Sequence, residues 1–261
     1  MSDYEKITKL PKPVFGGISS AQKIRPPATQ AVQEFLFKKM PTSVYISRRF
    51  VKKMLIIGIS EVCRKRLCFP EEEFIIRLAG DMKVKVINPF VDNGKNESVT
   101  LIKKWIRKIF EWTENGWIDK VAITIGTGEL PSEKPLEIYA FSMKDKELCR
   151  KVDEHEIIDL TQEEDTKLQA DAEDLLQGLK KHVRPARDLP DNSTFSLQVV
   201  KSKNAPKDLK IDDFHPIENA PSFKKGNVFL KRQVQTKFHR FGVVGVEAAD
   251  SDENIETHQS W

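Results

Sequence analysis

The sequence lacks the features that mark secreted, membrane-spanning and disulfide-rich proteins. It has three cysteines in 261 residues, and Cys63, Cys68 and Cys149 form no pair with metal-ligand spacing, so we expect reduced thiols. The longest apolar run, Met54 to Ile59, is far shorter than the roughly 20 residues that a membrane-spanning helix needs. The charged start of the chain has no apolar segment typical of a signal peptide. We therefore expect an intracellular, soluble protein.

An excess of charge of one sign is also missing. The chain carries 43 basic and 39 acidic residues, a formal net charge of +4, which is too small to indicate nucleic-acid binding by itself. Basic side chains do gather on two expected helices, at Arg48, Arg49, Lys52, Lys53 and Arg64 to Arg66 on the first, and at Lys103, Lys104, Arg107 and Lys108 on the second. A solvated helix face is the simpler interpretation, and direct DNA binding remains an alternative.

Catalytic and metal-binding patterns are absent as well. The five histidines have no ligand at a spacing that predicts a zinc site, and the neighbours of His155, Glu154 and Glu156, point away from it on a helix or a strand. Gly126-Thr127-Gly128 lacks the further residues of a phosphate-binding loop and is better interpreted as a hairpin turn. No serine lies in a nucleophile elbow. We expect no enzyme, no metal site and no cofactor.

Hydrophobic periodicity predicts three long helices and a mainly antiparallel sheet. Thr42-Ser43 begins a helix to about Arg66 whose apolar residues cover most of its circumference, so it should be central in the core. A second helix starts at Asn96 or Ser98 and ends at Asn115-Gly116, and Thr161 to Glu164 is a capping box for a third. Strands are expected at 82–87, 117–125, 136–143, 194–201, 228–234 and 238–246, with a short helix possible within 28–40 and a helical turn at 71–79. This order indicates an α+β domain with helices covering one face of the sheet.

The ends of the chain and one long connection differ in composition from this domain. We expect a flexible N-terminal tail at 1–30, a domain at 31–247 and an acidic C-terminal tail at 248–261. Residues 202–225 form a proline-punctuated loop, and the two strands after it have little local support. These strands are either an ordinary edge hairpin or a segment that can detach, and the residues leave both interpretations open.

Several segments resemble the HORMA domain family. Ser43 to Phe74, with its Cys68-Phe69-Pro70 step, is similar to the first helix and following turn of that family, and Leu101 to Phe110 to the second helix. Lys120 to Ile125 and Leu136 to Phe141 resemble the next two strands. The most specific match is Thr236 to Phe241, which resembles the Thr-x-Phe-His-x-Phe segment of the meiotic chromosome-axis branch. The resemblance covers roughly residues 30–247. One departure is Cys68, where the family has a small residue or glycine, and it indicates a divergent, nematode-like member.

The resemblance implies a HORMA fold, with three long helices packed on a mainly antiparallel sheet and a C-terminal safety belt at 202–247. Such a belt encloses a closure-motif peptide, which adds to the sheet as a strand. By position, the receiving strand would be Phe195 to Val200. The residues expected to contact the peptide are Leu175, Leu179, Phe195, Leu197, Val199, Val228, Leu230, Val234, Phe238 and Phe241.

The resemblance also implies partners and a cellular role. We expect the chain to bind closure motifs of other axis HORMA proteins, to reach chromatin indirectly through axis and cohesin proteins, and to support homologue pairing, synapsis and crossover control on meiotic chromosomes in the nucleus. Self-assembly is expected through the N-terminal tail or through a C-terminal motif absent from this sequence. The candidate self closure motif is Pro13, Val14, Phe15, Gly16, Gly17 and Ile18. The alternative is another HORMA adaptor, of the spindle checkpoint or of DNA repair.

Overall fold

A computed structural model describes most of the chain. The described residues are 4–7, 10–11, 33–89, 97–127, 135–184, 189–190, 192–206, 209, 214–217 and 226–248. For residues 4–7, 10–11, 97–98 and 214–217 the description covers the backbone only. None of the helices in these ranges has a stretch long and apolar enough to cross a membrane.

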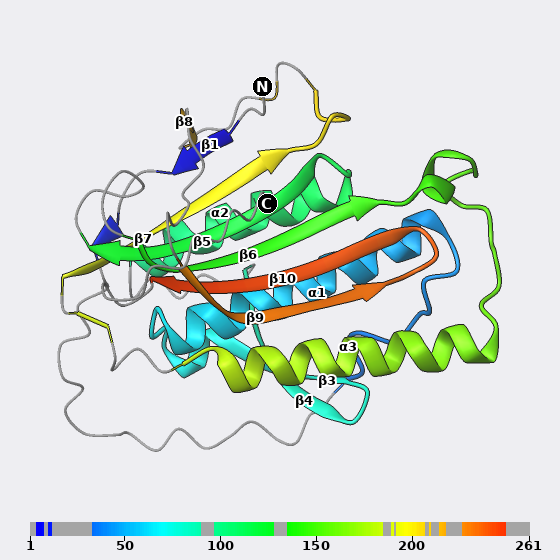
Figure 1. Ribbon diagram of the computed structural model, residues 1–261, viewed down its shortest axis with the longest axis horizontal. Helices are drawn as coiled ribbons and strands as arrows, with labels where there is room; N and C mark the ends of the chain where they lie inside the picture. The colour runs from blue at the N-terminus through cyan, green and yellow to red at the C-terminus, as the bar shows by residue number, and fades with distance from the viewer. Residues whose placement is uncertain are drawn as a thin grey trace.

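The centre of the fold is an antiparallel sheet of eight strands (Figure 1). Its strands are β1 (Tyr4–Ile7), β2 (Leu10–Pro11), β5 (Ile118–Thr127), β6 (Pro135–Asp145), β7 (Ser193–Lys201), β8 (Phe214–Ile217), β9 (Gly226–Gln235) and β10 (His239–Ala248). They lie in the order β8-β1-β7-β5-β6-β10-β9, with β2 also paired to β7. The expected α+β class and the mainly antiparallel sheet are confirmed.

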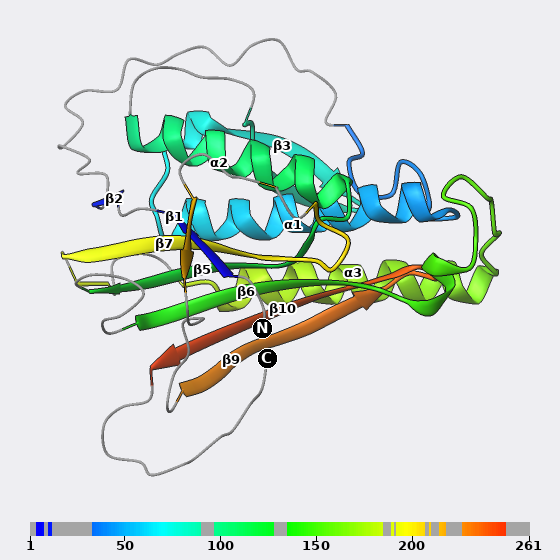
Figure 2. The ribbon, with the colours of Figure 1, turned by 90° about the horizontal axis from the view of Figure 1, so that it is seen from above.

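The three long helices lie on one side of this sheet (Figure 2). They are α1 (Val44–Lys65), α2 (Glu97–Glu114) and α3 (Gln162–His182), and α1 runs behind the centre of the sheet while α3 packs along β9. The Ser43 hydroxyl accepts a hydrogen bond from the amide of Ile46 at 3.2 Å, which confirms the expected start of α1. The capping box between Thr161 and Glu164 is also present.

Helix α1 is covered on its other side by a β-hairpin, which explains why it is apolar nearly all round. Strands β3 (Phe74–Ala79) and β4 (Met82–Ile87) form a separate antiparallel pair, and β4 packs on α1. The prediction of a helical turn over 71–79 was wrong, because only Glu71–Glu73 is a 3₁₀ turn and the rest pairs with β4. Phe74 to Ile76 is a short apolar run, which periodicity alone cannot assign to a helix or a strand.

Two other boundaries differ from expectation. The described part of the 28–40 segment contains no helix, and Glu34 instead makes an isolated parallel bridge to Leu78 of the hairpin. Helix α2 begins at Glu97, so Ser98 lies inside the helix, while Asn96 is outside the described residues. The predicted end of α2 is confirmed, because Gly116 follows it with a φ of 71°, a conformation that favours glycine.

A buried ion pair joins the end of α1 to the sheet. The Arg66 side chain is 1% exposed, and its Nε donates to Glu137 Oε2 on β6 at 2.9 Å. The Tyr139 hydroxyl donates to the same carboxylate oxygen at 2.8 Å. Burial and the Glu137 carboxylate both raise the pKa of Tyr139, so the phenol stays protonated. The network therefore satisfies a charged pair that would otherwise be costly to bury.

The turn after α1 explains the departure at Cys68. Cys68 has a φ of 52° and is the one non-glycine residue with positive φ in the described ranges. The left-handed region costs an L-residue about 1–2 kcal/mol, whereas glycine enters it freely. Cysteine therefore occupies a position whose backbone suits glycine.

We expect Cys68→Gly to raise the free energy of unfolding by about 0.5–1 kcal/mol, because relief of backbone strain exceeds the added entropy of the unfolded chain. Urea denaturation would measure this gain. Cys68→Ala is the matched control, since it also removes the exposed thiol but keeps the Cβ. If the glycine variant were no more stable than the alanine variant, strain at this turn would not be significant.

Candidate peptide-binding site

The outer edge of β7 receives a strand from the other end of the chain. β1 pairs antiparallel with β7, with Tyr4 opposite Val200 and Lys6 opposite Gln198. β2 continues along the same edge, with Leu10 opposite Phe195. The pairing is made by main-chain groups, so it aligns the added strand with β7 without requiring particular side chains. The expected receiving strand, Phe195 to Val200, is therefore an edge that accepts an extended segment.

A second strand flanks the inserted segment on its far side. β8 pairs antiparallel with β1, from Tyr4 opposite Ile217 to Ile7 opposite Phe214 (Figure 1). β8 belongs to the connection between β7 and β9, and β8 and β9 are the two end strands in the sheet order. The inserted strand thus lies between β7 and a strand of the 202–225 connection. This arrangement encloses an extended segment on both sides.

The predicted contact residues fall into two separate groups. Phe195, Leu197 and Val199 lie on β7, the strand that receives β1. The other seven lie toward the opposite edge, on α3 (Leu175, Leu179), on β9 (Val228, Leu230, Val234) and on or just before β10 (Phe238, Phe241). The sheet order places β5, β6 and β10 between β7 and β9. The ten residues therefore do not form one surface. The sequence pattern could not predict this, because it does not show which end of the sheet the last two strands join.

The β7 side chains that alternate toward the helices are core residues. Phe195 and Leu197 are each 4% exposed and line a void of about 10 Å³ together with Trp105 and other apolar side chains of α1 and α2. A void of this size holds no more than one water molecule. Contact with an added strand at β7 therefore comes from the edge and not from a side-chain pocket on the helix side.

The C-terminal hairpin is held to the domain by the segment that carried the most specific resemblance. The Thr236 hydroxyl accepts hydrogen bonds from the amides of Phe238 at 3.1 Å and His239 at 2.8 Å, and it lies 2.6 Å from Ser47 Oγ of α1. Phe238 and Phe241 are fully buried, and Phe241 stacks on Phe141 of β6. In this structure these residues anchor β10 along β6.

The candidate self closure motif, Pro13 to Ile18, lies outside the described residues. The strands that occupy the β7 edge are instead β1 and β2, a few residues earlier in the same tail. The sequence pattern predicted none of β1, β2 and β8. The signal for β1 is a short mixed run, Tyr4 to Ile7, which is too brief for a period-two pattern to stand out.

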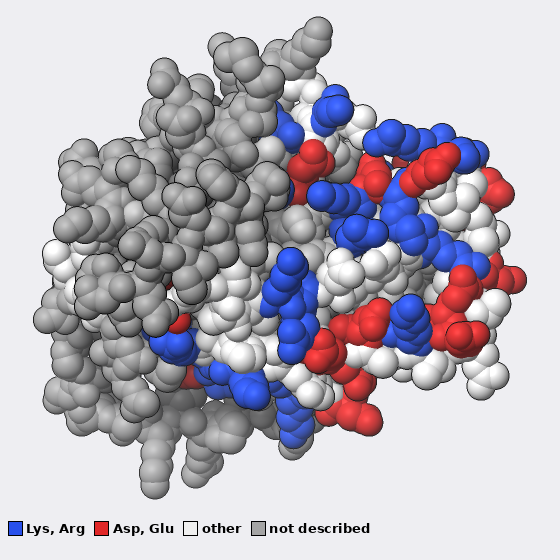
Figure 3. Space-filling view, viewed as in Figure 1, with Lys and Arg blue, Asp and Glu red and all other residues white. Residues whose placement is uncertain are grey.

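Most of the basic side chains on α1 and α2 that were candidates for a DNA-binding surface are paired with acids. Arg48 Nη1 lies 2.8 Å from Glu154 and Lys52 Nζ lies 2.5 Å from Glu114. Lys103 was expected on a solvated face but is 3% exposed and ion-paired with buried Glu73. These ion pairs give little support to direct DNA binding through α1 and α2. Figure 3 looks onto the sheet side, with these helices behind it, and shows blue and red side chains interspersed over the described part of that face.

Ser47, His239 and Asp145 include the residue types of a hydrolytic triad, but their burial argues against catalysis. Ser47 Oγ lies 2.6 Å from His239 Nδ1, and His239 Nε2 lies 3.5 Å from Asp145 Oδ1. Ser47 is fully buried and His239 is 4% exposed, so no substrate reaches the hydroxyl. Desolvation lowers the pKa of His239 to about 3, and the imidazole is neutral at physiological pH.

Comparison with known proteins identifies the fold. The family profile for the HORMA domain matches residues 47–239. The structure of C. elegans HTP-2 bound to HTP-3 closure motif 1 matches with a TM-score of 0.63 and 14% identity, covering 88% of this chain and 99% of that one. C. elegans HTP-1 bound to HIM-3 closure motif matches with a TM-score of 0.62 and 16% identity over 81% of this chain and 94% of that one.

A chain of the mitotic checkpoint complex also matches, with a TM-score of 0.54 and 19% identity, covering 79% of this chain and 97% of that one. No curated protein matches the sequence. At these identities the structural likeness concerns the fold, whereas the profile match spans most of the chain. The chain therefore belongs to the HORMA domain family.

Proposed function

We propose that this protein is a peptide-binding adaptor of the meiotic chromosome axis, not an enzyme. The observation that carries the proposal is the insertion of β1 between β7 and β8. It supports a site in which an extended peptide adds to the β7 edge and the 202–225 connection closes over it. Release of such a peptide requires local unfolding of the covering segment, so complexes should dissociate slowly.

The choice of branch rests on two supporting observations. The Thr236 to Phe241 segment resembles meiotic axis proteins, and two of the similar structures are C. elegans HORMA proteins bound to closure motifs. We therefore propose that the partners are closure motifs of other axis HORMA proteins, that chromatin is reached indirectly, and that the protein acts in homologue pairing, synapsis and crossover control in the nucleus. The domain would span 31–247, and the 202–247 segment would include the belt. A checkpoint adaptor is the second candidate, favoured by the likeness to the mitotic checkpoint complex.

Localisation separates these two roles. A fluorescent protein should be fused after Trp261, because the N-terminal strand lies in the proposed site and a fusion there would disturb it. We expect continuous signal along chromosomes in meiotic prophase nuclei. Signal at kinetochores of dividing somatic cells, with none on meiotic chromosomes, would favour the checkpoint role and contradict the axis role.

A further inference from the structure

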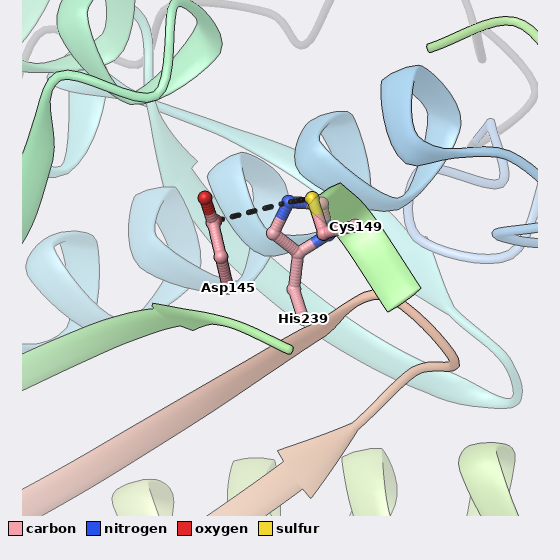
Figure 4. Close-up of side chains that lie close together, drawn as sticks. All are labelled: Asp145, Cys149 and His239. Carbon is pink, nitrogen blue, oxygen red and sulfur yellow. Dashed lines mark hydrogen bonds and ion pairs between the residues drawn. The ribbon is translucent and has the colours of Figure 1, made fainter. Parts of the chain in front are cut away.

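Three side chains with metal-binding atoms meet at the start of β10 (Figure 4). Asp145 ends β6, Cys149 lies in the 3₁₀ turn Glu147–Arg150, and His239 is the first residue of β10. Their ligand atoms all lie within 4.8 Å of one another. His239 Nε2 is 3.5 Å from Asp145 Oδ1 and 3.7 Å from Cys149 Sγ.

These separations fit the edges of a zinc coordination tetrahedron. Zinc binds histidine nitrogen and carboxylate oxygen at about 2.0–2.2 Å and thiolate sulfur at about 2.3 Å. Tetrahedral angles then place neighbouring ligand atoms roughly 3.3–3.7 Å apart, as the same bond lengths require. The two distances from His239 Nε2, 3.5 and 3.7 Å, lie within that range.

The surroundings of His239 orient its ring for this role. Nδ1 lies 2.6 Å from Ser47 Oγ, which in turn lies 2.6 Å from Thr236 Oγ1. If Nδ1–H donates to Ser47, the Nε2 lone pair is directed toward Asp145 and Cys149. A ligating histidine commonly donates its other ring N–H to such an outer partner, which fixes the tautomer and the ring orientation.

The charges of the ligands match that of the ion. The carboxylate of Asp145 and the thiolate of Cys149 together would neutralise one divalent ion. The other charges that act on Cys149 are Arg150 and the pair of Arg48 and Glu154, whose charged groups lie 2.8 Å apart. Asp145 and Cys149 are only partly buried, so a water molecule can reach a fourth position.

We propose that Asp145, Cys149 and His239 bind one zinc ion, with water as the fourth ligand. The ion would tie the first residue of β10 to the end of β6 and to the turn after it. Sequence spacing predicted no metal site, because His239 is 90 positions away from Cys149 and only the return of β10 along β6 brings them together.

Titration of the metal-free full-length chain with Co²⁺ tests this site. A thiolate ligand gives cobalt a near-ultraviolet charge-transfer band, and a tetrahedral site gives strong visible bands. We expect both, saturating at one equivalent at micromolar protein. We also expect Zn²⁺ to abolish them by displacement, because Co²⁺ loses ligand-field stabilisation when it enters a tetrahedral site and Zn²⁺ has no such preference. Absence of a thiolate band in the folded wild-type chain would overturn the proposal.

Two variants and a control assign the ligands. Cys149→Ser should remove the charge-transfer band, and Asp145→Asn should weaken Co²⁺ binding at least tenfold. Cys68→Ser should leave the spectrum unchanged, because the exposed Cys68 lies outside the cluster. Loss of the band in Cys68→Ser and its retention in Cys149→Ser would place the metal on a surface thiol and contradict the proposal.

Discussion

A chain that lacks residues 1–11 should bind an added copy of its own N-terminal segment more tightly than the full-length chain does. In the full chain, β1 and β2 already occupy the β7 edge, so a second peptide must compete with a tethered one. If the tail fills the site in about nine-tenths of the molecules, the apparent affinity for the second peptide falls about tenfold. Fluorescence anisotropy of a labelled peptide of residues 1–12 measures the difference.

The matched control is a labelled peptide of the same composition in scrambled order. We expect it to bind both forms of the protein weakly and equally. Light scattering of the full-length chain should show a monomer, because β1 pairs with β7 of its own chain. Equal affinity of the truncated and full-length chains for the 1–12 peptide would show that the tail does not occupy the site.

Arg66→Met should lower the free energy of unfolding by about 3–5 kcal/mol, the usual loss when one partner of a buried ion pair is removed. The substitution leaves the Glu137 carboxylate, whose side chain is 10% exposed, without its buried cation. Urea denaturation monitored by circular dichroism measures the loss. The double variant with Glu137→Met should recover most of it, because two apolar side chains of similar volume leave no uncompensated charge.

An exposed ion pair provides the control for this experiment. Lys151 and Glu147 lie 2.5 Å apart, but their side chains are 64% and 80% exposed. Lys151→Met should change the free energy of unfolding by less than about 1 kcal/mol, as exposed pairs usually do. A loss for Arg66→Met as small as that of the control would contradict the importance of the buried network.

The sequence predicted those parts of the fold that depend on local pattern. The apolar circumference of α1, the capping box at Thr161 and the glycine after α2 each act within a few residues, and each is confirmed. The β3 strand was missed, since its stability comes from pairing with β4, which in turn packs on α1. The strand propensity of a segment does not show which tertiary partners it will pack against.

The candidate site was predicted less completely for the same reason. The resemblance indicated the receiving strand, and β7 does carry an added strand. Which edge the C-terminal strands join depends on contacts far apart in the sequence, such as Phe241 on Phe141 and Thr236 beside Ser47. The cluster of Asp145, Cys149 and His239 depends on the same return of β10.

Hydrogen–deuterium exchange of residues 194–200 tests the central claim, that the β7 edge accepts an extended peptide. The pairing with β1 and β2 predicts slow exchange in the full-length chain. Exchange should become fast when residues 1–11 are deleted, because the β7 amides that face β1 and β2 lose their hydrogen-bond acceptors. It should become slow again when the 1–12 peptide is added and supplies new acceptors. Exchange in 194–200 that is the same in all three states would contradict the account.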